Sequence, residues 1–168
     1  MLREILAEEP GNPLANLRLG YALVGSGRCA EAEPRFQKTI DARYPSADAH
    51  LGLAGCQAAK GNPKAAAATL RAASTLEPDN PVVLANLGLM LSEAGQPADA
   101  IGPLERALAA NPDLHQARFG LALALATTGR REEAANQARD LLRRLPAGAT
   151  QRPEVERLLA ALREPGSN

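Results

Sequence analysis

The sequence predicts an all-α protein, an α-solenoid of stacked helical hairpins that ends in a capping helix. Three observations predict this class. Apolar residues recur at the helical spacing i, i+3, i+4, i+7 in paired segments, and the pairs are divided by short glycine-containing breaks. The whole pattern repeats at a period of 34 residues. No segment shows the alternation of apolar and polar residues that is typical of a half-buried strand.

The run 81–114 shows the repeating unit most clearly. Its first half places one apolar face on a helix, formed by Leu84, Leu87, Gly88 and Leu91. Its second half does the same with Ile101, Leu104, Ala107 and Leu108. The break at 95–97 divides the two halves, so we expect two helices whose apolar faces meet.

The same residue sizes return in register in four copies. Small residues occupy the eighth position, Gly20, Ala54, Gly88 and Ala122, and the twentieth, Ala32, Ala66, Ala100 and Ala134. Leucines occupy the seventh position, Leu19, Leu53, Leu87 and Leu121, and the twenty-fourth holds Phe36, Leu70, Leu104 and Ala138. The breaks contain Gly27, Gly61, Gly95 and Gly129, and the units close at Pro45, Pro78, Pro112 and Pro146. Small residues let helices approach closely and large ones fill the space between them, so these columns predict the core.

The elements follow in order along one solenoid domain. Residues 1–12 are expected to hold the second helix of a truncated repeat, over 2–9. Repeats at 13–46, 47–80, 81–114 and 115–148 are expected to form hairpins, with helices over 13–25 and 28–43, 47–60 and 63–76, 81–94 and 97–110, and 115–128 and 131–145. Residues 149–168 should form the capping helix, over 151–163, and a frayed tail. Pro63 and Pro97 favour helix starts, whereas Pro34 and Pro103 fall inside helices and are expected on the outer side.

These columns resemble the tetratricopeptide repeat family over about nine tenths of the chain. The resemblance implies a right-handed stack of hairpins that binds other proteins. Two columns depart from the family pattern: the fourth position, usually aromatic, holds Asn16, His50, Leu84 and Arg118, and the eleventh, usually Tyr, holds Leu23, Gln57, Leu91 and Leu125. Ala138 at the twenty-fourth position predicts a looser last hairpin.

Composition and charge exclude several classes of partner. The chain is 45% hydrophobic but only 2% aromatic, so its core must be built from Leu and Ala. Nineteen basic and 19 acidic residues cancel, which argues against nucleic acid as a partner. The arginine-rich last 40 residues are predicted to form a solvated face with ion pairs. No apolar run is long enough for membrane insertion, and the acidic start is unlike a signal peptide; a cytoplasmic location is favoured if this is the whole protein.

The inventory of chemically reactive residues predicts no enzyme, no cofactor and no metal site. His50 is expected as a partly buried structural residue and His115 as a solvated one. Cys29 and Cys56 lack metal-ligand spacing; unpaired thiols are favoured, although the sequence leaves a disulfide open.

The family resemblance places a ligand groove on the first helices. Its predicted residues are Leu17, Arg18, Tyr21, Leu51, Gly52, Gly55, Ala85, Asn86, Leu89, Glu93, Gln116, Phe119, Gly120 and Leu123. Large apolar residues alternate there with glycines, which suggests slots for the bulky side chains of a ligand. Close packing of the chain's own helices stays open as the alternative reason for Gly52, Gly55 and Gly120. The lysine and asparagine set with which relatives grip a C-terminal carboxylate is absent, since only Asn86 matches.

We therefore expect a non-catalytic interaction module that binds an extended peptide or an amphipathic helix with apolar anchors. Two alternatives stay open. The first is a tethered domain of a larger protein, such as an enzyme. The second is a scaffold that assembles with itself through Leu2, Ile5 and Leu6. The identity of the partner, the oligomeric state and the redox state of the cysteines cannot be decided from the sequence.

Overall fold

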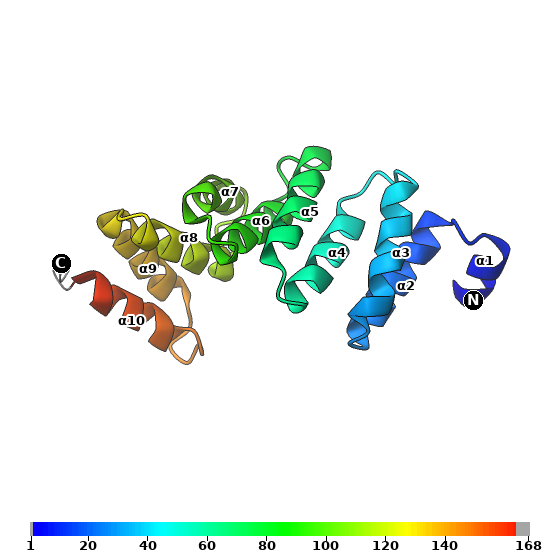
Figure 1. Cartoon of the computed structure of the whole chain (residues 1–168). Coiled ribbons are helices and arrows are strands. Elements are labelled where there is room, and N and C mark those ends of the chain that lie inside the picture. Colours follow the sequence, from blue (N-terminus) through cyan, green and yellow to red (C-terminus); the bar gives the residue numbers. More distant parts are fainter. Residues whose placement is uncertain (1, 164–168) are drawn as a thin grey trace. The chain divides into compact units, whose positions relative to one another are not determined.

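Ten helices and no strand make up residues 2–163, the part of the chain that the computed structural model describes (Figure 1). The helices are α1 (Leu2–Glu8), α2 (Pro13–Gly25), α3 (Cys29–Asp41), α4 (Asp48–Ala59), α5 (Pro63–Leu76), α6 (Pro81–Glu93), α7 (Pro97–Ala110), α8 (His115–Thr127), α9 (Arg131–Arg144) and α10 (Arg152–Arg163). The all-α class of helical-hairpin repeats is therefore as predicted. The helix boundaries lie within two residues of the expected ones.

Asparagine and proline together define several helix starts. The Asn12 side chain accepts a hydrogen bond from the backbone N–H of Ala15 at 2.9 Å, and Asn80 accepts one from Val82 at 2.9 Å. Each is followed by a proline at the first helical position, where a missing N–H costs nothing. Asn62 and Pro63 start α5 in the same way.

Glycine ends the first helix of every hairpin. The four turn glycines have φ between 71° and 81°, a left-handed conformation that disfavours residues with a Cβ atom; they are Gly27, Gly61, Gly95 and Gly129. The residue after each glycine donates its N–H to a carbonyl five positions earlier, as Gln96 does to Leu91 at 2.9 Å. This bond closes the helix end and reverses the chain within three residues.

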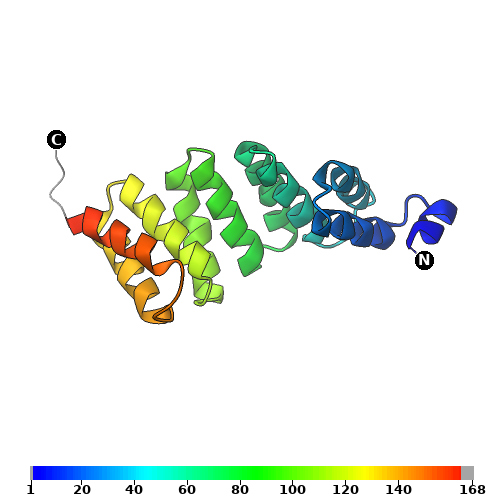
Figure 2. The ribbon, with the colours of Figure 1, turned by 90° about the horizontal axis from the view of Figure 1, so that it is seen from below.

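The chain divides into two compact units, residues 1–78 and 79–168. In the first unit α1 packs on α2, α2 on α3, and α4 on both α3 and α5. In the second unit α6 packs on α7, α7 on α8, α8 on α9, and α10 on α9. Within each hairpin the two helices run antiparallel (Figures 1 and 2). The first helices are also in contact, α2 with α4 and α6 with α8.

The predicted size columns form the core. All four alanines of the twentieth position are fully buried, and so are Phe36 and Leu104 of the twenty-fourth. The Phe36 ring lies between Gly20 of α2 and Gly52 of α4, where an added Cβ on Gly20 would come within 2.7 Å of it. Leu104 packs in the same way on Gly88. A large side chain of the second helix thus fits against glycines of the first helices, which lets these helices approach.

Cys29 and Cys56 form a disulfide, so the expectation of unpaired thiols is corrected. Cys29 is the first residue of α3 and Cys56 lies in the second half of α4, and the helix contact brings their Cα atoms to 5.3 Å. The sequence could not show this because the two residues are 27 positions apart and belong to different repeats. The bond joins the second helix of one hairpin to the first helix of the next.

Both interior prolines fit within their helices. Pro34 of α3 is exposed, as predicted, whereas Pro103 of α7 is only partly exposed. Since proline lacks the N–H that would bond one turn back, each removes one bond from the helix ladder.

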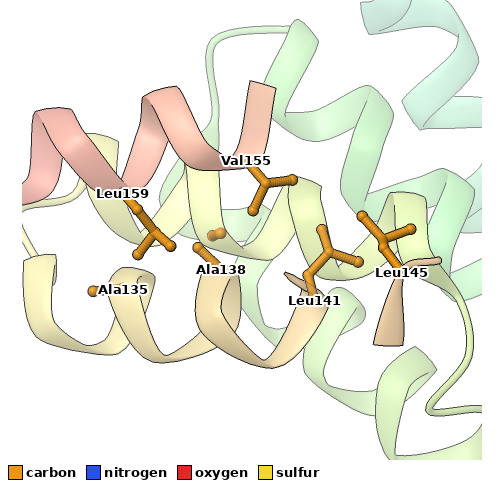
Figure 3. Packing of buried hydrophobic residues seen from close by; sticks show 7 residues of the cluster. Ala135, Ala138, Leu141, Leu145, Val155 and Leu159 are labelled. Carbon is orange, nitrogen blue, oxygen red and sulfur yellow. The ribbon is translucent and has the colours of Figure 1, made fainter. Parts of the chain in front are cut away.

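The capping helix α10 completes a buried cluster at the end of the second unit. Val155 and Leu159 point from α10 toward Ala138 and Leu141 of α9 (Figure 3). Ala138 is fully buried there, so the last hairpin is not loose: its small side chain lies in a cluster that α10 helps to fill.

Two arginines fasten α10 to α9 at opposite ends. The Arg131 guanidinium donates to the carbonyls of Ala161 and Leu162 at 3.0 and 3.1 Å, near the end of α10. Arg152 donates to Leu142 and Leu145, both at 2.9 Å, at the end of α9. Each guanidinium satisfies terminal carbonyls that the helix itself leaves free. Other charged residues of the last 40 form ion pairs on the surface, as predicted; Arg130 with Glu133 is one example.

Polar residues of the fourth position hold the preceding loop. The Asn16 amide donates to the Pro10 carbonyl at 3.0 Å, and Arg118 donates to the Pro112 carbonyl at 2.8 Å. Arg118 also pairs with Asp140 at 2.9 Å. In these two repeats, the family's aromatic residue is thus replaced by a side chain that bonds a proline carbonyl of the preceding loop.

Candidate functional site

The predicted groove residues divide by exposure into three groups. Those open to solvent are Arg18, Tyr21, Gly55, Glu93, Gln116 and Leu123. Those partly buried are Leu51, Asn86, Leu89 and Phe119. Those buried are Leu17, Gly52, Ala85 and Gly120. Leu17, Gly52 and Gly120 are closed off from a ligand, so the prediction is corrected for these three residues. Ala85 is largely buried but still lines a hollow of the second unit.

In the first unit, an apolar stripe on α2 remains exposed. It consists of Leu14, Tyr21 and Val24, which are 41%, 43% and 36% exposed. The Tyr21 hydroxyl donates to the Asp48 carbonyl of α4 at 2.7 Å, and its ring packs edge-on against Phe36. Partial burial, with the charge of Asp48, raises the pKa of Tyr21 above its ordinary value. Tyr21 therefore holds α2 against α4 while one part of its ring stays open.

The glycine slots of the predicted groove are filled from within. Gly52 lies beneath the Phe36 ring, and a Cβ on Gly120 would come within 2.5 Å of Leu89 Cδ2. Only Gly55, among these three, faces open space. Close packing of the chain's own helices thus explains Gly52 and Gly120, and no ligand side chain is needed.

In the second unit, a hollow of about 340 Å³ lies where α6 and α8 begin. Its lining includes Val82, which is 48% exposed, together with Asn86 and Leu89 of α6. The other side is formed by the loop and first turn at 113–117. The Asn86 amide makes no hydrogen bond within residues 2–163, so it is available to a peptide backbone.

A second hollow of about 500 Å³ lies where the same two helices end. Its lining is Ser92, Glu93, Gly95, Pro97, Leu123, Ala124 and Thr127. Leu123 is 41% exposed and supplies the largest apolar surface. The α6 and α8 face therefore offers a hollow at each end, with apolar side chains in both.

Phe119 does not belong to this open surface. It packs against the cluster that α9 and α10 share, so its ring is partly buried in the unit. Residues 113–115 line the first hollow, and the sequence analysis did not include them because the helix positions of the family pattern do not reach the preceding loop.

The two histidines have similar surroundings. His50 is partly buried, as predicted, beside Tyr44 and Leu76, and this burial lowers its pKa below the ordinary value. His115 was expected to be solvated, but it is partly buried and its Nδ1 atom is enclosed without a hydrogen-bond partner. Within residues 2–163, neither imidazole forms a hydrogen bond or an ion pair with a carboxylate.

Residues 2–163 contain no group of three or more His, Cys, Asp or Glu placed to hold a metal ion. None of the helices described is both long and apolar enough to cross a bilayer.

Paired antiparallel helices and size-selective columns define the chain as a helical-repeat protein. A family model described as "Tetratricopeptide repeat" matches residues 17–81 and 86–149. The chain belongs to the tetratricopeptide repeat family, as its residue columns suggested. Proteins of this family are generally non-catalytic interaction modules.

Solved structures agree on the fold. The chain resembles YrrB, described as a TPR protein with an unusual peptide-binding site, with a TM-score of 0.85 and 20% identity over 96% of this chain and 81% of YrrB. For MamA the TM-score is 0.79, with 24% identity over 85% of this chain and 84% of MamA. For pilF of Pseudomonas aeruginosa it is 0.73, with 25% identity over 89% of this chain and 67% of pilF. These likenesses support the all-α solenoid class. No curated protein sequence matches the chain.

Proposed function

We propose that the α6 and α8 face of residues 79–168 binds an extended peptide or an amphipathic helix through apolar anchors. The observation that carries this proposal is the pair of hollows at the two ends of that face, each with an exposed apolar side chain, Val82 or Leu123. Exposed apolar side chains beside hollows are typical of binding surfaces. The free Asn86 amide in the first hollow suits a ligand whose backbone groups are unpaired. The likeness to YrrB, described as a TPR protein with an unusual peptide-binding site, also supports the proposal.

A random linear peptide library tests this proposal. We expect the protein to enrich peptides that carry aliphatic or aromatic residues. The double variant Val82→Arg, Leu123→Arg should lower the affinity for the enriched peptides at least about tenfold, because central apolar anchors carry much of the binding free energy. Both side chains are exposed, so helix content should stay near that of the parent.

The matched control is Ala98→Arg with Ala109→Arg, which adds the same charge to exposed positions of α7. This control should keep the parent's affinity. If no peptide is enriched, or if the first double variant binds as the parent does, the proposal is wrong.

The double variant Leu89→Glu with Phe119→Ala, taken from the predicted groove residues, is a less suitable test. Leu89 packs over Gly120 and Phe119 packs on the α9 and α10 cluster, so this change would disturb the fold. Val82 and Leu123 avoid that difficulty.

Self-association is a second candidate, favoured by Ile5, which is 38% exposed on α1. Leu6 instead lines a hollow with Leu19 and Leu23 of its own unit, and the Leu2 side chain lies outside the described residues. If Ile5 joins copies, the molar mass in solution rises with concentration and Ile5→Asp abolishes the rise. A tethered role in a larger protein remains compatible with either function.

A further inference from the structure

The hollow at the ends of α6 and α8 carries an unpaired carboxylate. Glu93 is exposed and makes no ion pair or hydrogen bond within residues 2–163. Some acidic residues of the unit are paired instead: Glu133 pairs with Arg130 at 2.6 Å, and Asp140 pairs with Arg144 at 2.9 Å. Glu93 differs from the other unpaired carboxylates in lining a hollow of the α6 and α8 face. The negative charge of Glu93 therefore remains uncompensated.

Two helix ends add to this negative potential. Glu93 is the last residue of α6, and α8 ends at Thr127 in the same hollow. The carbonyl end of a helix carries a partial negative charge, so a carboxylate there is electrostatically unfavourable for folding. A basic residue in this place would have favoured the helix. The stability of the helix therefore does not explain why a glutamate stands at position 93.

No basic side chain opposes Glu93 along the ligand face. The α6 and α8 residues that line the two hollows or belong to the predicted groove include no Lys or Arg; they are Val82, Ala85, Asn86, Leu89, Ser92, Glu93, His115, Gln116, Ala117, Phe119, Gly120, Leu123, Ala124 and Thr127. Asp113, at the other end, pairs with Arg144 at 3.1 Å. The face is therefore apolar with one free negative charge.

We infer that the hollow of about 500 Å³ receives a lysine or arginine side chain of the bound peptide, next to an aliphatic residue that packs on Leu123. The long apolar stem of such a side chain suits Leu123 and Ala124, while its charged end reaches the Glu93 carboxylate and the helix-end carbonyls. This inference rests on the proposed function, and it specifies the ligand as basic and apolar, not acidic.

The test compares peptides selected by the parent with those selected by Glu93→Lys. The parent should enrich peptides with Lys or Arg beside an aliphatic residue. Glu93→Lys should bind these peptides at least about fivefold more weakly, and its own selection should lose the basic residue. The affinity of the parent should fall as salt concentration rises, because the partly exposed pair is screened.

A stability measurement separates this role from a structural one. Lysine at the end of α6 complements the helix dipole, so Glu93→Lys should melt at the parent's temperature or higher while binding more weakly. The matched control Glu105→Lys makes the same charge change at an exposed position of α7 and should keep the parent's affinity for the selected peptides.

The outcomes distinguish this inference from the proposed function. The inference of a basic ligand is wrong if the selected peptides depend on Val82 but contain no preferred Lys or Arg. It is also wrong if they bind Glu93→Lys as tightly as the parent. In both cases the proposal that the α6 and α8 face binds peptides still holds. If no peptide is enriched, or if the enriched ones ignore the α6 and α8 variants, both proposals are wrong.

Discussion

Two glycines of α4 lie three residues apart and have different surroundings. Gly52 is covered by the Phe36 ring, which is fully buried and bounded on its other side by Gly20. Gly55 faces open space, with no heavy atom within 4 Å of an added Cβ. The same substitution at the two sites should therefore change stability in opposite directions.

We predict that Gly52→Ala lowers the free energy of unfolding by about 1–3 kcal/mol, since the enclosed ring has no room to move away. Gly55→Ala should raise it by up to about 1 kcal/mol, because alanine favours the helix over glycine. Urea unfolding of both variants and the parent measures the difference. If Gly52→Ala is as stable as Gly55→Ala, the Phe36 ring does not pack tightly against Gly52, contrary to this prediction.

Residue columns and packing were not equally predictable from the sequence. The period of 34 placed every helix because glycine turns and asparagine–proline starts are local signals. The position of the Phe36 ring against Gly52 is not local, since it depends on the distance between helices of different repeats. For that reason the sequence assigned Gly52 and Gly120 to a ligand, whereas side chains of the same chain fill both places.

At the scale of elements, α10 is held by apolar packing and by guanidinium groups at both of its ends. The sequence predicted the packing from the spacing of Val155, Leu158, Leu159 and Leu162. It treated Arg152 as part of a solvated face, because charge spacing along one helix does not show which carbonyls a neighbouring helix leaves free. In the structure the Arg152 side chain is only 27% exposed and reaches two such carbonyls.

We predict that Arg152→Met destabilises the attachment of α10 by about 1–3 kcal/mol, the scale of hydrogen bonds made by a charged donor. Methionine keeps much of the apolar stem, so the loss is assigned to the two bonds. Hydrogen exchange should become faster in α10 and at the end of α9. Arg139→Met is the control, since Arg139 is exposed and bonds only Asn136 of its own helix. Equal exchange in the two variants would show that Arg152 contributes nothing to docking.

At the scale of the whole molecule, the two compact units differ in their covalent reinforcement. The Cys29–Cys56 bond lies entirely within residues 1–78, and the other unit contains no cysteine. Helical-repeat proteins are stabilised by terms between neighbouring repeats, so a local cross-link mainly affects the hairpins it joins. The disulfide therefore gives the two units separate responses to the redox state of the surroundings.

We predict that reduction lowers the stability of residues 13–76 by roughly 3–4 kcal/mol, the entropic scale for a loop closed over a separation of 27 residues. Hydrogen exchange followed by mass spectrometry should show faster exchange across α2 to α5 when a thiol reductant is added, while α6 to α10 exchange as before. The double variant Cys29→Ala, Cys56→Ala should resemble the reduced parent and should not respond to the reductant. Equal loss of protection in α6 to α10 would show that the cross-link stabilises the chain as one cooperative body, contrary to this prediction.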